Sequence, residues 1–287
     1  MHLTAGQTVL NIFAPVNSPI HSPETLEGWW ALHQIFAVDQ SPSDEWRQNH
    51  GPVVMNPVGH LADTLADLAV SPDAGWSAAV QLIGSGADIM LVHFRQTLDD
   101  IGAVQHWLAE VPAMASLRLR SSFLSITEAG MYHLTAKLAR ETAARGGTVG
   151  DDEYRNELAG RLATERSNPH VHRRLYPPLP NDMPYVCFYP MSKRRETGQN
   201  WYTLPLDDRS QLMRAHGETG RRYAWRIFQV ITGSIGFEAW EWGVTLFASD
   251  PLDFKKLVTE MRFDEASAKY AEFGEFYVGR LVRRGGG

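Results

Sequence analysis

The 287-residue sequence contains a single cysteine, Cys187. One thiol cannot form a disulfide within the chain or supply a four-cysteine zinc site. Cys187 lies in the apolar run of residues 185–189. This setting is typical of a small core residue rather than of a nucleophile.

The sequence also lacks a long hydrophobic run and an excess of basic charge. No apolar stretch approaches the roughly 20 residues that span a bilayer, and residues 1–6 do not show the basic-then-apolar pattern of a signal peptide. We therefore expect no transmembrane segment and a cytoplasmic location. The net charge of −6 argues against a nucleic-acid-binding protein.

Several common catalytic signatures are missing. The sequence has no GxGxxG or Walker loop, no HExxH, no CxxC and no GxSxG motif. Nucleotide binding, zinc-dependent hydrolysis and α/β-hydrolase chemistry are thus not supported. What the sequence does contain is many aromatic residues and histidines: nine Trp, nine Tyr, twelve Phe and eleven His.

Hydrophobic periodicity predicts the same order of elements twice. Residues 14–25 form a loose, proline-rich lead. The N-terminal half then has strand, helix, strand, strand, helix and strand patterns at residues 29–38, 58–70, 78–83, 88–94, 98–109 and 117–127. The C-terminal half repeats this order at residues 185–191, 207–224, 226–233, 242–248, 251–270 and 276–282.

This β-α-β-β-α-β order is that of a ferredoxin-like fold. We therefore predict an α+β protein with two ferredoxin-like halves, at residues 1–145 and 183–287, whose sheets pack face to face or close together. Residues 146–182 between them form a linker that contains a helix at 151–166 and a proline-rich segment at 168–180.

The predicted strand at residues 185–191 ends in chemically interesting side chains. Alternation places Tyr185, Cys187 and Tyr189 on one face, and Pro190 is expected to end regular pairing. A cationic cluster follows at residues 193–195. Tyr189 could present its phenol to an anionic ligand, or it could be a buried tyrosine next to a solvated basic turn.

Further along the chain, each candidate residue has both a structural and a functional interpretation. His216, with Gly217 and Gly220 beside it, could be a structural histidine or could face a flat ligand that the glycines accommodate. Gln229 could bond the backbone or point into a cavity. Trp242 could fill the core or form the wall of a pocket, and Ser267 would ordinarily be a surface or capping residue.

The segments around these residues resemble one known family, the coproheme decarboxylases of the chlorite dismutase superfamily. The resemblance covers residues 172–280, while residues 1–115 look divergent. It rests on the order and spacing of seven segments: residues 189–195, 200–202, 216–220, 229–234, 241–246, 250–256 and 260–265.

The resemblance implies a dimeric α+β barrel, a homopentamer and a cytoplasmic enzyme of haem biosynthesis. The implied reaction converts iron coproporphyrin III (coproheme), both substrate and redox cofactor, to haem b by two hydrogen-peroxide-dependent oxidative decarboxylations of propionates. Transient contact with coproporphyrin ferrochelatase is a further implied interaction.

The same resemblance implies residue roles. His216 corresponds to the proximal iron ligand, for which a neutral imidazole is the expected donor. Tyr189 corresponds to a tyrosine that forms a radical and takes hydrogen from a propionate. Lys193 corresponds to a lysine that fixes the second reactive propionate, and Ser267 to a propionate hydrogen-bond donor.

The other implied contacts are less specific. Arg174 corresponds to a propionate-binding arginine, although Arg173 competes for this role. Trp201 and Trp242 correspond to tryptophans near the haem. Gln229 occupies the distal position at which chlorite-splitting relatives carry an arginine, and a neutral amide cannot hold an oxyanion as a guanidinium does. Gln229 therefore favours decarboxylation over chlorite dismutation. Non-enzymatic haem binding is a second alternative.

Overall fold

Eight antiparallel strands form a closed ring. The computed structural model describes residues 21–38, 57–67 and 71–283. The strands follow one another around the ring in the order β7, β6, β4, β1, β3, β2, β9 and β5, and β5 then pairs with β7. Their bounds in chain order are β1 Thr25–Val38, β2 Gly75–Leu82, β3 Ile89–Arg95, β4 Leu117–Gly130, β5 Tyr185–Lys193, β6 Ile227–Gly233, β7 Trp242–Ala248 and β9 Tyr277–Val282. A ninth strand, β8 Ala271–Phe273, lies outside the ring and pairs with the end of β5.

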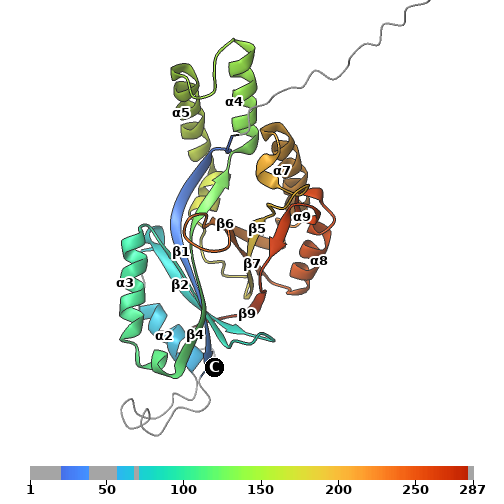
Figure 1. Ribbon diagram of the computed structural model, residues 1–287. Coiled ribbons are helices and arrows are strands. Elements are labelled where there is room, and N and C mark those ends of the chain that lie inside the picture. The colour runs from blue at the N-terminus through green and yellow to red at the C-terminus, as the bar shows by residue number, and fades with distance from the viewer. Residues whose placement is uncertain (1–20, 39–56, 68–70, 284–287) are drawn as a thin grey trace, which may run out of the picture.

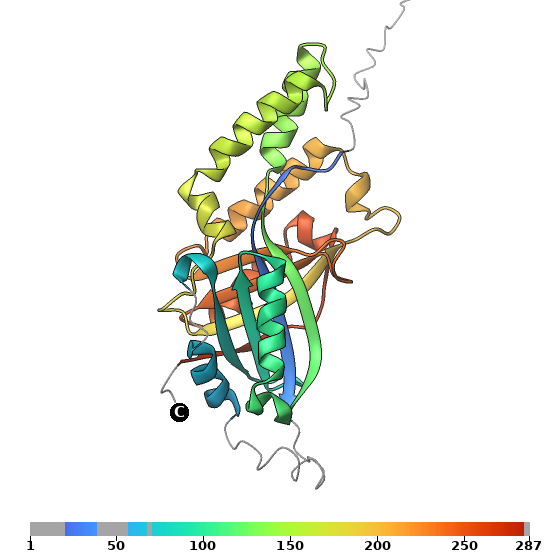
Figure 2. The same cartoon turned by 90° about the vertical axis from the view of Figure 1, so that its left-hand side faces the viewer.

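Helices cover the outside of the ring in two groups (Figure 1). Helices α2 Pro57–Asp67 and α3 Leu98–Ala109 lie against the strands of the N-terminal half, and α7 Leu206–Arg221, α8 Leu252–Met261 and α9 Glu265–Ala268 cover those of the C-terminal half. Helices α4 Tyr132–Ala144 and α5 Asp152–Arg166 run side by side away from the ring (Figure 2), joined by an ion pair between Arg161 and Glu141. Helix α6 Pro169–Leu175 and three short 3-10 turns, Pro72–Ala74, Pro112–Ser116 and Trp201–Thr203, complete the elements.

The interior of the ring is a core shared by both halves. Val80 and Phe123 from the N-terminal half pack with Phe188 and Phe247 from the C-terminal half. A second apolar layer, which includes Leu246, lies between the outer face of the C-terminal strands and helix α8, which contributes Phe254 and Leu257. Each fully buried side chain of this size stabilises the fold by about 1.5–3 kcal/mol. Because the two halves supply these side chains together, neither half has a complete core alone.

The predicted fold class is confirmed. Each half has the β-α-β-β-α-β order, and the two sheets close into one barrel. The helix predicted at residues 98–109 has those bounds, because Thr97 caps its first turn through the backbone N–H of Asp100. The boundaries at 145 and 183 between the predicted parts stay a prediction. Parts of two predicted segments, residues 14–20 and 68–70, lie outside the described residues.

Five details differ from the sequence prediction. The proline-rich segment at 168–180 begins with helix α6, because Asn168 caps it and Pro169 occupies its first turn, where proline is favoured. The single helix predicted at 251–270 is two helices, α8 and α9, because Asp264 caps a new helix through the backbone N–H of Ser267. Helix α4 and strand β8 were not predicted from the sequence.

The fifth difference concerns Pro190, which does not end strand β5. The strand continues to Lys193, with Pro190 opposite Gly243 of β7. The carbonyl of Pro190 accepts a hydrogen bond from the backbone N–H of Gly274 at 2.8 Å. Because the strand runs on, Tyr189 and Lys193 belong to the same regular strand.

Cys187 is buried, with 2% of its surface exposed. Burial raises the pKa of its thiol to about 12, so the thiol stays protonated and unreactive at neutral pH. This agrees with the predicted role as a core residue. Within the part of the chain that the structure describes, no helix has the length and apolar character needed to cross a membrane.

Candidate functional site

Four of the candidate residues lie on the outer side of the C-terminal strands. In antiparallel strands, residues directly opposite each other point to the same face. Tyr189 lies opposite Val244, and Met191 lies opposite Trp242. Leu246 lies opposite both Cys187 and Gln229. Tyr189, Lys193, Gln229 and Trp242 therefore share the face that α8 packs against.

Tyr189 is a buried phenol at the centre of this face. Only 8% of its surface is exposed, and its ring stacks on Phe276 with 4.3 Å between ring centroids. Burial raises the pKa of Tyr189 well above its usual range, and the nearby Arg262 guanidinium offsets this only in part. The phenol is thus a neutral O–H group at neutral pH.

Lys193 is a buried cation on the same side of β5. Its Nζ donates a hydrogen bond to the carbonyl of Ala266 at 2.8 Å and lies 4.2 Å from the centre of the Trp201 ring. Burial lowers the pKa of Lys193 to about 8, although the charges of Asp264 and Glu241 oppose the shift. A carboxylate placed here would accept a charge-assisted hydrogen bond from the ammonium form of Lys193.

His216 lies on α7 and is held by a carboxylate. Its Nδ1 lies 3.0 Å from Oδ2 of Asp264, and 27% of its side chain is exposed. Asp264 also accepts hydrogen bonds from the backbone N–H and the hydroxyl of Ser267, both at 3.1 Å. Burial tends to raise the pKa of Asp264. The hydrogen bonds from His216 and Ser267, together with the charge of His216, outweigh burial and lower the pKa.

This arrangement suits a metal-binding imidazole. A carboxylate that accepts from Nδ1–H fixes the tautomer and leaves the lone pair on Nε2, as in many metal-ligating histidines. His216 shares one side of α7 with Gly220, four residues later. A Cβ on Gly220 would lie 3.9 Å from Oε1 of Gln229. The side of α7 that carries His216 therefore looks toward the strand face.

The two tryptophans occupy different parts of the site. Trp201 is 1% exposed and packs edge-on against Tyr270, with 5.6 Å between centroids, beneath the Lys193 ammonium group. Trp242 is half-buried, and its indole Nε1–H donates to Oε1 of Glu128 on β4 at 3.3 Å. Trp201 thus shapes the surroundings of Lys193, and Trp242 links the two halves.

The structure separates the two competing arginines of α6. Arg173 is exposed, and its guanidinium lies 4.9 Å above the ring of Phe228. Phe228 precedes Gln229 in β6 and therefore points to the opposite face. Arg174 is half-buried; burial lowers its pKa, and the charge of Glu128 opposes the shift. Arg174 is thus the arginine next to the Trp242 end of the face.

Three further residues belong to this cluster, although sequence reasoning assigned them no role. Asp264 has a sequence signal, because an aspartate three residues before a serine is typical of a helix N-cap. Glu241, whose Oε2 accepts from the backbone N–H of Lys193 at 2.7 Å, lies in a recognised segment but carries no such signal. Glu128 lies on a strand of the other half and cannot be found without the fold.

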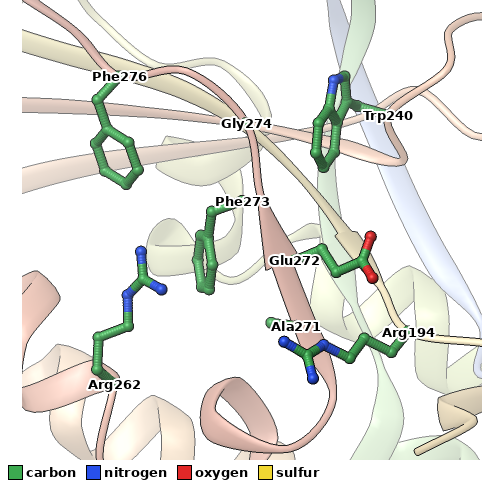
Figure 3. Close-up of a pocket in the computed structure, with 8 residues that line it drawn as sticks. All are labelled: Arg194, Trp240, Arg262, Ala271, Glu272, Phe273, Gly274 and Phe276. Carbon is green, nitrogen blue, oxygen red and sulfur yellow. The ribbon is translucent and has the colours of Figure 1, made fainter.

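An open pocket of about 440 Å³ lies beyond Phe273, a neighbour of Tyr189. In Figure 3 the side chains of Arg262 and Arg194 lie on either side of the Phe273 ring. The Arg262 guanidinium stacks 4.0 Å above that ring. The residues that line the pocket are Arg194, Trp240, Arg262, Ala271, Glu272, Phe273, Gly274 and Phe276. None of the candidate residues lines it, so this pocket adjoins the cluster without containing it.

No cluster of three or more histidine, cysteine, aspartate or glutamate side chains suited to a metal ion occurs among residues 21–38, 57–67 and 71–283. An iron porphyrin needs no such cluster, because a single histidine is a sufficient protein ligand. The imidazole of His216, with its far nitrogen on Asp264, fits this requirement.

Comparisons with known proteins find relatives of this sequence and fold. Residues 59–282 match the family model described as chlorite dismutase. A coproheme decarboxylase of Staphylococcus saprophyticus is 39% identical over 263 residues, which cover 92% of this chain and 95% of the relative. A solved heme-binding protein from Thermus thermophilus is 35% identical with a TM-score of 0.68, over 92% of this chain and 96% of that one. A chlorite dismutase from Candidatus Nitrospira defluvii, at 15% identity and a TM-score of 0.58 over 90% of this chain and 92% of that one, shares the fold.

Proposed function

The chain belongs to the chlorite dismutase family, and on that premise we propose that it is a coproheme decarboxylase. It would convert iron coproporphyrin III to haem b by oxidative decarboxylation of two propionates. The observation that carries the proposal is the shared face on which a buried phenol, Tyr189, and a buried cation, Lys193, lie opposite the helix that bears His216. The similarity to a coproheme decarboxylase over nearly the whole chain supports it.

His216 is the residue that would hold the iron. Its Nδ1–H bond to Asp264 increases the basicity of the imidazole and fixes its orientation. Bound iron would supply the redox chemistry that reduces hydrogen peroxide. The protein would then bind the propionates of the porphyrin and remove hydrogen atoms from them.

Tyr189 would carry out the hydrogen transfer. Because its pKa is raised, the O–H bond stays intact until oxidation removes a hydrogen atom, and the resulting phenoxyl then takes a hydrogen atom from the propionate carbon next to the ring. Loss of carbon dioxide and a second electron leaves a vinyl group. Each propionate thus consumes one peroxide and one proton and yields a vinyl group, carbon dioxide and two water molecules.

Lys193, Arg174 and Ser267 would anchor the carboxylates. The buried ammonium of Lys193 offers a strong, charge-assisted hydrogen bond to the second reactive propionate. Arg174 would bind another propionate. The Ser267 hydroxyl would turn away from Asp264, to which it donates in this structure, and donate to a third. Trp201 and Trp242 would form walls of the porphyrin site.

Gln229 would lie on the peroxide side. Its amide is neutral, so it can donate a hydrogen bond to peroxide but provides no charge that would retain chlorite. This feature favours decarboxylation over chlorite dismutation, the activity named for other members of the family.

We also propose, from the family resemblance, a homopentameric assembly, a cytoplasmic location and transient contact with coproporphyrin ferrochelatase. Sedimentation of the purified chain would give a mass five times that of one copy. A monomer or dimer at the concentration of the assay contradicts the pentamer.

The deciding experiment titrates the purified protein, loaded with iron coproporphyrin III, with hydrogen peroxide. Mass spectrometry should show the loss of two carbon dioxide units through an intermediate that has lost one. Oxygen release from chlorite without decarboxylation would instead identify a chlorite dismutase. Bound but unchanged pigment would identify a non-enzymatic haem-binding protein.

A further inference from the structure

A glutamate from the N-terminal half lies beside the proposed propionate-binding residues. Glu128 lies on β4, and its Oε1 accepts the indole N–H of Trp242 at 3.3 Å. Its side chain passes over Gly233 of β6, where an added Cβ would collide with Oε2 of Glu128. The missing side chain at position 233 is therefore needed for Glu128 to occupy this place.

The charges around Glu128 are unbalanced. Burial raises the pKa of Glu128, and so does Glu27, which lies directly opposite on β1; the Trp242 hydrogen bond and the charge of Arg174 act against this rise. Arg174 has no ion pair within 4.0 Å among the residues that the structure describes. The backbone holds the two residues near each other, because the hydroxyl of Thr127, next to Glu128, donates to the carbonyl of Leu175, next to Arg174, at 2.7 Å. Glu128 is thus a charged neighbour of Arg174 that does not form an ion pair with it.

We propose that Glu128 is a positioning and specificity-determining residue, which holds Trp242 in place and limits how strongly Arg174 binds a porphyrin carboxylate. This inference rests on the proposed function. When a propionate binds Arg174, two carboxylates share one guanidinium, and like charges at one site disfavour each other. The product haem b still carries two propionates, so a weakened grip at Arg174 lets it leave.

The charge and the hydrogen bond of Glu128 can be separated by substitution. In Glu128→Gln the amide oxygen still accepts from Trp242, but the negative charge is gone. The matched control is Glu27→Gln, which removes the same charge from the opposite position on β1, where Glu27 is exposed and accepts from the hydroxyl of Thr25. A non-specific effect of net charge would appear in both variants.

The test is an absorbance titration of the full chain with iron coproporphyrin III. Glu128→Gln should bind it roughly tenfold more tightly than the unchanged chain, and Glu27→Gln should bind it equally. In an Arg174→Gln background, Glu128→Gln should have no effect. An unchanged or weakened affinity, or equal tightening with and without Arg174, overturns the proposal.

Two further measurements keep the test decisive. If Glu128→Gln does not fold, Glu128→Met fills a similar volume without charge and must show the same dependence on Arg174. Peroxide turnover of the unchanged chain, followed by mass, is recorded separately. Loss of turnover there refutes the decarboxylase proposal, whereas the affinity differences refute or support the role of Glu128 alone.

Discussion

The low pKa of Lys193 predicts that porphyrin binding weakens in mild alkali. Burial lowers this pKa to about 8. The ammonium form would then make up about nine-tenths of the population at pH 7 and about one-tenth at pH 9. If only the ammonium form grips the propionate, affinity should fall about tenfold across this range, or roughly 1.4 kcal/mol.

Metal-free coproporphyrin III is the appropriate probe, because its fluorescence reports binding and no iron-bound water titrates in this range. Cys187 does not interfere, since burial raises its pKa to about 12. The control is Lys193→Arg, whose guanidinium stays charged up to pH 9. A tenfold loss in the unchanged chain and a flat profile in Lys193→Arg are expected. A flat profile in both would refute the idea that Lys193 binds a carboxylate.

Three further predictions concern other residues. Tyr189→Phe keeps the stacking on Phe276 and should bind coproheme within about threefold, yet lose no carbon dioxide with peroxide; full turnover would contradict the mechanism. His216→Ala should change the absorption spectrum of bound coproheme, and Asp264→Asn should weaken iron binding about 10- to 100-fold; unchanged spectra in both would show that another residue binds iron. Burial lowers the pKa of His33 from 6.5 to about 3. Between these two pH values the His33 imidazole is protonated in the unfolded chain but neutral in the folded one, so the free energy of unfolding falls as the pH drops. His33→Gln should remove about 2 kcal/mol of the stability loss between pH 7 and pH 5, measured by urea unfolding; an equal loss in both proteins would contradict this.

Local pattern was sufficient for much of the fold. Strand alternation placed Tyr185, Cys187 and Tyr189 on one face because the period of a strand is two, whatever the strand pairs with. The same argument extends to Lys193 only once the strand is known to pass through Pro190. The sequence rule that proline ends pairing failed because a carbonyl remains available for bonding at that position.

Long-range partners were beyond sequence reasoning. The bond between His216 and Asp264 joins residues 48 positions apart, and it depends on the break between α8 and α9, which a continuous helical pattern concealed. Glu128 is 114 positions from Trp242. Its place near the site follows from the pairing of β4 with β6 across the two halves, which no local pattern encodes.

The closed ring of strands also limits how this protein can be divided. β4 pairs with β6 and β2 pairs with β9, so each half supplies a partner for both edges of the other. A cut in the linker followed by separate expression would leave each half with two exposed strand edges and half of a shared core. Such fragments are expected to aggregate alone and to become soluble only when produced together, since each one shields the other's unpaired backbone.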